Sequence, residues 1–369
     1  MSTSDRSAGE NASEMGPEER SAAPAPGADA QAGPADEEAV LRDAKRFQHD
    51  FLAVREQIER VVVGHRSIVD GVLTCLFTGG HALLEGVPGL GKTLLIRTLA
   101  GALDLEFHRI QFTPDLMPAD ITGTTVVRES EGTRAFVFEP GPIFSQILLA
   151  DEINRATPKT QAAMLEAMQE RMVTAGGETR PLPRPFFVMA TQNPVEQEGT
   201  YPLPEAQLDR FFFKLQVGYS TRDQLAEILR RTTAGEEARA DAVIDAERII
   251  AHQRLVRRVA IADHVSDYAV RMVLATHPGG DFAPPQVSKY VRLGASPRAA
   301  QALVLAGKCR ALVAGRAAVS TDDVKQVSAP ALRHRILLNF EGQAEGLTTD
   351  DVVRTIADTL PVQAPTRAA

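Results

Sequence analysis

A glycine-rich stretch with the sequence GVPGLGKT, residues 86–93, carries the residue types that bind a polyphosphate. Glycines let the backbone turn so that successive N–H groups point inward at phosphate oxygens. Lys92 can reach the β and γ phosphates of a nucleotide, and the Thr93 hydroxyl suits Mg²⁺. The residues expected to hold the nucleotide are Gly86, Val87, Pro88, Gly89, Leu90, Gly91, Lys92 and Thr93.

Two acids follow a second apolar stretch, residues 147–150 with the sequence ILLA. A P-loop NTPase needs an apolar strand that delivers an aspartate to the Mg²⁺ shell, so Asp151 is expected beside Thr93. Glu152 is expected to activate or orient the attacking water as a general base. The competing interpretation is a buried strand that happens to end in two surface acids.

Three more polar residues follow in order. Asn193 comes after the apolar run 186–190 and is expected to hold the water and sense the γ-phosphate. Arg210 precedes another apolar run and is expected to neutralise charge on the transferred phosphoryl group, in its own subunit or a neighbour's, with Arg155 as second candidate. Arg298 begins a helix that would bring it over the nucleotide. Taken singly, each has a simpler interpretation: Asn193 as a turn residue, Arg210 as a surface arginine and Arg298 as part of a helix start.

These side chains need a sheet that gathers them at one edge. Apolar runs that end in turn signals predict strands that alternate with helices over residues 39–218, an α/β domain with a parallel sheet. Turn signals at 130–132 and 176–177 predict two hairpins. Residues 219–369 show almost only helical periodicity, which predicts an all-helical second domain. Residues 1–38 lack large apolar residues and are expected to be a disordered acidic tail.

The composition indicates a globular protein and disfavours several other classes. Of 369 residues, 44% are hydrophobic and 24% charged, as in globular proteins. Residues 1–38 hold nine acids and two arginines, so most of the net charge of −8 lies there and a nucleic-acid surface is disfavoured. Cys75 and Cys309 are expected to be buried thiols in a reducing compartment. The sequence shows no membrane span and no secretory signal, so a cytoplasmic location is expected.

The ordered strings GVPGLGKT, LLADEINRATPKTQAAMLEAMQE, MATQNP, LDRFFFK and GASPRA resemble the MoxR family of AAA+ ATPases. The resemblance runs from about Glu38 to Leu360. It implies an AAA+ P-loop NTPase domain followed by a helical lid, with ATP and Mg²⁺ as cofactors. It also implies a homo-hexamer with chaperone-like action on protein clients, among them von Willebrand A domain proteins.

By matching position, the resemblance also gives each site residue a family role. Val63 and Gly64 fall in the box beside the adenine, where His65 replaces the family's usual glutamine. The hairpins at 124–138 and 171–183 resemble the helix-2 and pre-sensor-1 insertions. The remaining roles are Walker A for Gly86–Thr93, Walker B for Asp151 and Glu152, sensor 1 for Asn193, arginine finger for Arg210 and sensor 2 for Arg298.

Three alternatives stay open at this point. A DNA-acting AAA+ motor would use similar hairpins, yet the tips at 130–132 and 175–178 carry acid instead of the Lys or Arg that track phosphates. A nucleotide-gated scaffold would bind ATP with little turnover. A magnesium-chelatase-like motor subunit is a closer relative. The client, the pathway, the oligomer size and the role of the tail do not follow from the sequence.

Overall fold

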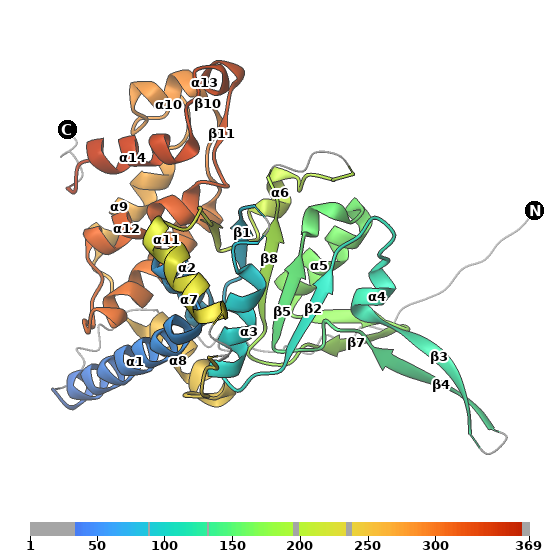
Figure 1. Ribbon diagram of the computed structural model, residues 1–369. Coiled ribbons are helices and arrows are strands. Elements are labelled where there is room, and N and C mark those ends of the chain that lie inside the picture. The colour runs from blue at the N-terminus through green and yellow to red at the C-terminus, as the bar shows by residue number, and fades with distance from the viewer. Residues whose placement is uncertain (1–33, 88, 131–132, 195–198, 234–237, 364–369) are drawn as a thin grey trace, which may run out of the picture.

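The computed structural model describes residues 34–87, 89–130, 133–194, 199–233 and 238–363. A five-stranded sheet with strand order β2-β5-β8-β1-β9 and parallel pairing forms the centre of the first half (Figure 1). This arrangement confirms the α/β class expected from the sequence. The strands are β1 (Ala82–Glu85), β2 (Phe107–Gln111), β5 (Ile147–Asp151), β8 (Phe187–Gln192) and β9 (Phe213–Gln216).

Helices cover both faces of this sheet. Successive residues of a strand point to opposite faces, so Leu84 and Leu149 pack on one side while Leu83 and Leu148 pack on the other. The first face meets α2 (Arg66–Thr78) and α3 (Lys92–Ala102), and the second meets α5 (Pro158–Glu170). The shorter elements of this half are α4 (Pro118–Thr122), the 3₁₀ turn η1 (Ile153–Arg155) and α6 (Glu205–Leu208).

Two antiparallel hairpins leave the sheet, as the turn signals predict. The longer hairpin pairs β3 (Gly123–Ser130) with β4 (Thr133–Pro140) and projects from the body (Figure 1). The shorter hairpin pairs β6 (Met172–Ala175) with β7 (Glu178–Pro181).

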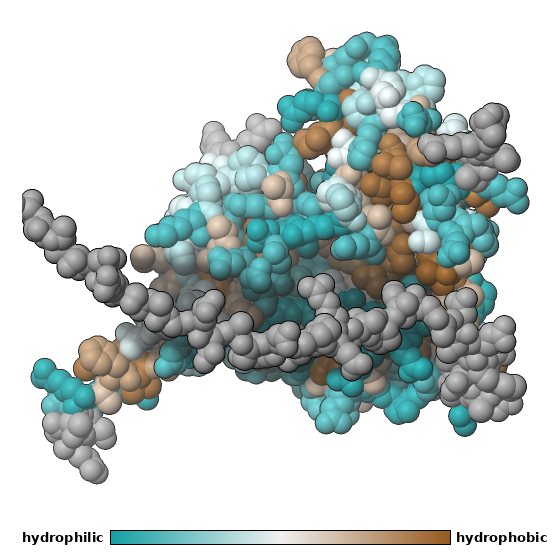
Figure 2. Space-filling view, turned by 180° about the vertical axis from the view of Figure 1, so that it is seen from behind, coloured by the Kyte–Doolittle hydropathy of each residue, from teal (hydrophilic) through white to brown (hydrophobic). Residues whose placement is uncertain are grey.

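The two hairpins touch at the base of the longer one, where the guanidinium of Arg180 lies 4.0 Å from the ring centre of Phe138. Beyond that contact Val127 and Phe136 face each other across the longer hairpin, with 56% and 81% of their surface exposed. Figure 2 shows hydrophobic residues gathered on this projection. The longer hairpin therefore presents apolar side chains to its surroundings.

The described residues of the second half are mostly helical. A two-stranded antiparallel sheet joins β10 (Val291–Leu293) to β11 (Leu337–Leu338), which corrects the expectation of an all-helical domain. Strands of two or three residues are too short to show an alternating pattern in the sequence. The helices are α7 (Arg222–Thr233), α8 (Ala246–Arg258), α9 (Asp263–Leu274), α10 (Pro285–Tyr290), α11 (Pro297–Val313), α12 (Thr321–Leu332), α13 (Phe340–Ala344) and α14 (Thr349–Thr359).

The N-terminal helices pack against the helical half as well as the sheet. Helix α1 (Pro34–Val61) contacts α11, and α2 contacts α8 and α11, so one continuous core runs from the sheet into the second half. A boundary at residue 218 therefore separates two kinds of secondary structure but not two cores. None of the described helices has both the length and the apolar composition needed to cross a bilayer.

Helix α1 also begins earlier than the sequence pattern indicates. It starts at Pro34, so the last residues of the expected tail, 34–38, are helical, while residues 1–33 lie outside the described part of the chain. Apolar periodicity marks only the part of a helix that packs, which is why it places the start late. After the end of α1 at Val61, the chain forms a bend with positive φ at Gly64 and His65.

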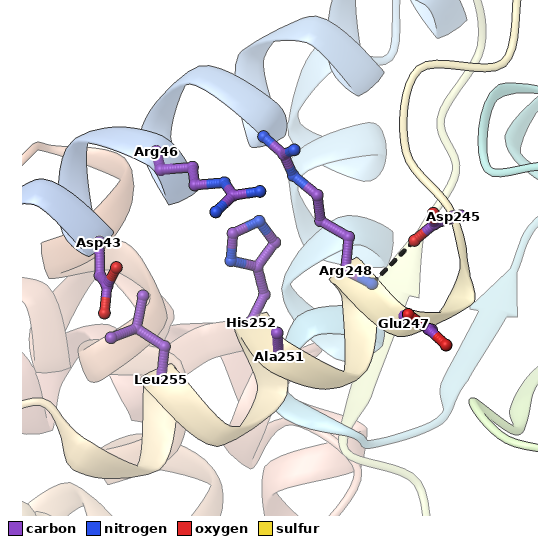
Figure 3. Close-up of a pocket in the computed structure, with 8 residues that line it drawn as sticks. All are labelled: Asp43, Arg46, Asp245, Glu247, Arg248, Ala251, His252 and Leu255. Carbon is purple, nitrogen blue, oxygen red and sulfur yellow. Dashed lines mark hydrogen bonds between the residues drawn. The ribbon is translucent and has the colours of Figure 1, made fainter.

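A charged cluster links α1 to α8. The Asp50 carboxylate, 3% exposed, accepts hydrogen bonds from Arg248 at 2.5 and 2.8 Å and lies 2.6 Å from His252 Nε2. Figure 3 shows Arg248 and His252 extending from α8 toward α1. Burial alone would raise the pKa of Asp50, but the hydrogen bonds from Arg248, His252 and His49 outweigh it and lower the pKa overall.

We expect Asp50→Ala to lower the free energy of unfolding by about 3 kcal/mol, because it removes the carboxylate from a buried ion pair. This is the lower end of the usual range, since 34% of the Arg248 side chain stays exposed. The lowered pKa stabilises the fold above the unfolded value of 3.8, and this contribution is lost as the pH falls through the folded pKa. Urea unfolding at pH 7 and at about pH 3.5 measures both effects. Asp43→Ala, an exposed acid of the same helix, is the control; equal stability of the two variants contradicts the prediction.

Candidate active site

A cavity of about 440 Å³ lies where β5 and β8 end and α3 begins. In an open α/β sheet, ligands bind beyond the carboxyl ends of the strands, and this cavity occupies that position. It brings together seven of the residues that the sequence singles out, from the glycine loop, the end of β5 and the end of β8. Its lining is Gly89, Gly91, Lys92, Thr93, Leu94, Arg109, Gln111, Asp151, Glu152, Thr191 and Asn193.

The glycine loop connects β1 directly to α3, so the chain folds into a strand, a loop and a helix N-terminus. Gly89 and Gly91 have φ values of 82° and 78°, which residues with a Cβ rarely adopt. A Cβ on Gly86 would lie 2.7 Å from the backbone oxygen of Val217. Glycine is therefore required at these positions by conformation and by close packing. Pro88, also expected to hold the nucleotide, lies outside the described residues.

Lys92 is held inside this loop. Its Nζ donates a 2.6 Å hydrogen bond to the Gly86 carbonyl oxygen. Burial lowers the pKa of Lys92, while the carboxylates of Asp151 and Glu152 oppose that shift. An ammonium group at the N-terminus of α3 is suited to phosphate oxygens.

Asp151 is fixed by two neighbours. Thr191 Oγ1 donates a 2.6 Å hydrogen bond to Oδ1, and Arg109 donates to Oδ2 from Nη2 at 2.7 Å and Nε at 3.1 Å. The Thr93 hydroxyl lines the same cavity. A carboxylate and a hydroxyl are hard oxygen ligands, so the donor set fits Mg²⁺ held together with nucleotide phosphates.

Glu152 leaves the strand in an unusual conformation that turns its side chain into the cavity. Its φ of 56° is left-handed, which costs an L-residue about 1–3 kcal/mol. Its backbone N–H donates to Thr191 Oγ1 at 2.9 Å, so the Thr191 hydroxyl fixes both acids. The carboxylate oxygen Oε2 accepts from Gln111 Nε2 at 2.8 Å and from Arg155 Nη1 at 3.0 Å.

Asn193 completes the group, because it follows β8 and lines the cavity, with 6% of its surface exposed. Arg109, Gln111 and Thr191 also line the cavity but are not among the site residues expected from the sequence. Arg109 and Gln111 alternate along β2, beside the strand that carries Asp151, and this polar alternation in an expected strand is the signal that could have revealed them.

The other predicted residues lie outside the lining of the cavity. Val63 and Gly64 form the bend after α1, where a Cβ on Gly64 would lie 2.6 Å from the Gln224 side chain of α7. Arg210 is half-buried in the turn after α6. Arg298 is exposed at the start of α11, where its Nη2 donates to Gln169 Oε1 at 3.2 Å. The roles expected for the site residues, these four included, stay predictions.

Asp209 connects the segments that carry Arg210 and Arg298. Its carboxylate accepts a 2.9 Å hydrogen bond from Ser296, the N-cap of α11, and a 2.8 Å hydrogen bond from Arg335. The Arg335 side chain is 3% exposed and also donates to the backbone oxygens of Asp209 and Phe211. Arg298 Nη1 lies 3.8 Å from the same carboxylate. One acid therefore ties the turn after α6 to the helical half.

A glycine loop between a buried parallel strand and a helix, together with a second strand of the same sheet that leads into two acids at the same cavity, defines the P-loop nucleotide-binding class. Residues 81–213 match the model of the ATPase family associated with various cellular activities (AAA), and residues 286–356 match the AAA lid domain. Taken with the relatives described next, these matches place the chain in the MoxR family of AAA+ ATPases.

The chain is 42% identical to Chaperone MoxR1 of Mycobacterium tuberculosis over 304 residues, which cover 82% of this chain and 80% of that one. It is 30% identical to Protein MoxR of Methylorubrum extorquens over 347 residues, with 88% and 97% coverage. Among solved structures, a provisionally assigned ATPase from Cytophaga hutchinsonii is similar with a TM-score of 0.82 and 40% identity, covering 88% of this chain and 98% of that chain.

Proposed function

We propose that this protein hydrolyses ATP with Mg²⁺ and uses the cycle to remodel or activate protein clients. The observation that carries the proposal is that Lys92, Asp151, Glu152 and Asn193 line one cavity at the carboxyl edge of the sheet. This set combines a phosphate-binding cation, an Mg²⁺ ligand, a general base and an amide for the water.

In the proposed mechanism, the loop N–H groups and Lys92 bind the phosphates, while Thr93 and Asp151 would hold Mg²⁺, which would neutralise phosphate charge. Asn193 orients the attacking water, and Glu152 accepts its proton. The described hydrogen bonds from Gln111 and Arg155 both reach Oε2 of Glu152, so they orient the carboxylate toward the cavity. Asp151 keeps its position through Thr191 and Arg109.

The active site is proposed to be completed by a neighbouring subunit in a homo-hexamer, which supplies Arg210 as the finger. Two observations support the choice of Arg210 over Arg155. Arg155 is bonded to Glu152 of its own chain, and Arg210 lies outside the lining of its own cavity. Movement of the helical half during the ATPase cycle would be transmitted to a bound client protein. Because one relative is named a chaperone, protein clients are proposed, von Willebrand A domain proteins among them, in the cytoplasm.

Phosphate release at varied protein concentration tests this function. Hydrolysis should require Mg²⁺, and the rate per subunit should rise with concentration, because a shared site forms only as subunits assemble. ATP binding with negligible turnover at every concentration would instead indicate a nucleotide-gated scaffold. Stimulation by single- or double-stranded DNA would indicate a DNA motor, and stimulation only by a porphyrin-binding partner would indicate a chelatase-like subunit.

Arg210→Ala is expected to retain nucleotide binding and to lose about 10³-fold or more in kcat, the effect of removing an arginine finger. Mixing this variant with Lys92→Ala should restore part of the activity, because the second variant supplies Arg210 to the intact cavity of the first. The ATPase rate of mixtures at several ratios measures the recovery. If the mixture stays as inactive as its components, Arg210 does not act between subunits. Arg155→Ala in the same mixture tests the second candidate.

A further inference from the structure

A second cavity, of about 200 Å³, lies at the opposite edge of the sheet and is lined by four arginines. Arg171 is the C-cap residue directly after α5, and Arg184 precedes β8, whose other end leads into Asn193. Arg254 and Arg257 come from α8 in the helical half. We call this site the arginine pocket. It lies between the two halves and away from the nucleotide cavity.

The positive charge of the arginine pocket is uncompensated within the described part of the chain. None of its four arginines forms an ion pair there, and no carboxylate is among its lining residues. Elsewhere in the protein, arginines such as Arg248 and Arg316 pair closely with aspartates. A cluster of unpaired cations in an acidic protein indicates a site for an anion.

The pKa shifts that these cations cause in one another also favour an anion site. Burial lowers the pKa of Arg171, and the nearby charges of Arg184 and Arg257 lower it further. Burial and the charge of Arg257 also lower the pKa of Lys308, whose Nζ donates to the Arg257 carbonyl oxygen. A bound anion would relieve this repulsion.

The geometry suits carboxylates in particular. Arg171 is half-buried and fixed, because its Nη2 donates a 2.8 Å hydrogen bond to the Gly79 carbonyl oxygen. Arg184, Arg254 and Arg257 are exposed, so their guanidinium groups are open to an approaching ligand. A guanidinium binds a carboxylate through two parallel N–H groups, and four of them suit an acidic chain segment.

The chain itself contains such a segment. Residues 1–33 hold six acids against two arginines, whereas the chain after residue 38 is nearly balanced in charge. The segment leads into α1, whose residues Asp43 and Arg46 line a cavity with Ala251 and Leu255 of α8. Pro34 precedes Asp43 by about 14 Å of helix. A 33-residue chain with the dimensions of a random coil would span on the order of 30 Å, enough to reach the far side of α8.

We propose that the arginine pocket binds the acidic N-terminal segment, residues 1–33, of the same chain. A tethered ligand is present at millimolar effective concentration, so weak individual contacts suffice. The bound segment would join the end of α5 and the start of β8 to α8. This interaction requires no nucleotide, so it stands or falls separately from the proposed ATPase function.

The test uses the full chain with a spin label on Ser13→Cys. Cys75 and Cys309 are fully buried and should not react with the label. In low salt we expect a slow-motion component in the spectrum, lost in the double variant Arg184→Ala with Arg254→Ala. It should also be lost in about 0.5 M NaCl, which screens exposed charges. A synthetic peptide of residues 1–33 at millimolar concentration should displace it too.

The control is the double variant Arg42→Ala with Arg222→Ala, which removes the same charge from exposed arginines elsewhere. It should keep the slow-motion component. A freely mobile label in the unmodified chain at low salt overturns the proposal, and so does a slow-motion component that survives loss of Arg184 and Arg254. Binding of a labelled single-stranded oligonucleotide tests nucleic acid as the alternative occupant of the arginine pocket. If it binds through these arginines while the segment stays mobile, the pocket belongs to nucleic acid and the proposal is wrong.

Discussion

Lys92→Ala is expected to lower the affinity for Mg²⁺-ATP by about 100-fold or more, equivalent to about 2.7 kcal/mol. Lys92 places its ammonium group at the Gly86 carbonyl, inside the glycine loop and within the cavity that Asp151 and Glu152 also line. Without the lysine, phosphate charge that enters this cavity meets two carboxylates whose remaining described cationic partners are Arg109 and Arg155. Repulsion therefore adds to the loss of the hydrogen bond.

Titration calorimetry of each protein with Mg²⁺-ATP measures this change. Lys289→Ala is a matched control, because this lysine lies at the end of α10 and its described partners are Glu341, Glu345 and Tyr290. The control should bind as the unmodified protein does. Unfolding curves that coincide for the two variants would show that Lys92→Ala acts on the site. Affinity retained by Lys92→Ala would remove the lysine from the phosphate site.

Glu152→Gln is expected to bind Mg²⁺-ATP normally and to reduce kcat by about 10²- to 10⁴-fold, the usual contribution of a general base. The amide has the size of the carboxylate and can still accept hydrogen bonds from Gln111 and Arg155. It cannot accept the proton of the attacking water. The substitution replaces a single carboxylate oxygen, so it should reduce turnover without changing the affinity for ATP.

Single-turnover hydrolysis, measured beside the dissociation constant for ATP, distinguishes the two effects. Glu166→Gln is the matched control, since Glu166 is an exposed glutamate of α5. Turnover by Glu152→Gln near the rate of this control would show that another group takes the proton. A pull-down with Glu152→Gln and ATP would also capture protein clients, since the complex would persist without hydrolysis.

The parts of the site that depend on local sequence were predictable. The strand, glycine loop and helix around Lys92 are adjacent in the chain, and Asp151 and Glu152 follow their own buried strand. Arg109 and Gln111 were not identified, because their role depends on the pairing of β2 with β5. No local pattern reveals which strand lies beside which.

The same limit applies to the helices. The amphipathic pattern of α1 predicts a buried face but not its partner, and that partner includes α11 from the other end of the chain. The boundary at residue 218 marks a change of periodicity, while the hydrophobic core continues across it. Periodicity reports which face of an element is buried, and tertiary structure decides what covers it.

Asp209 has a consequence for how subunits would communicate. Arg335 and Ser296 of the helical half donate hydrogen bonds to this carboxylate, so the turn with Arg210 and the beginning of α11 with Arg298 are joined through one side chain. In a ring whose Arg210 reaches the adjacent ATP, any tilt of α11 caused by one nucleotide would shift the cation presented to the next. Sequential ATP hydrolysis around the ring could then be coupled through the Asp209 carboxylate alone.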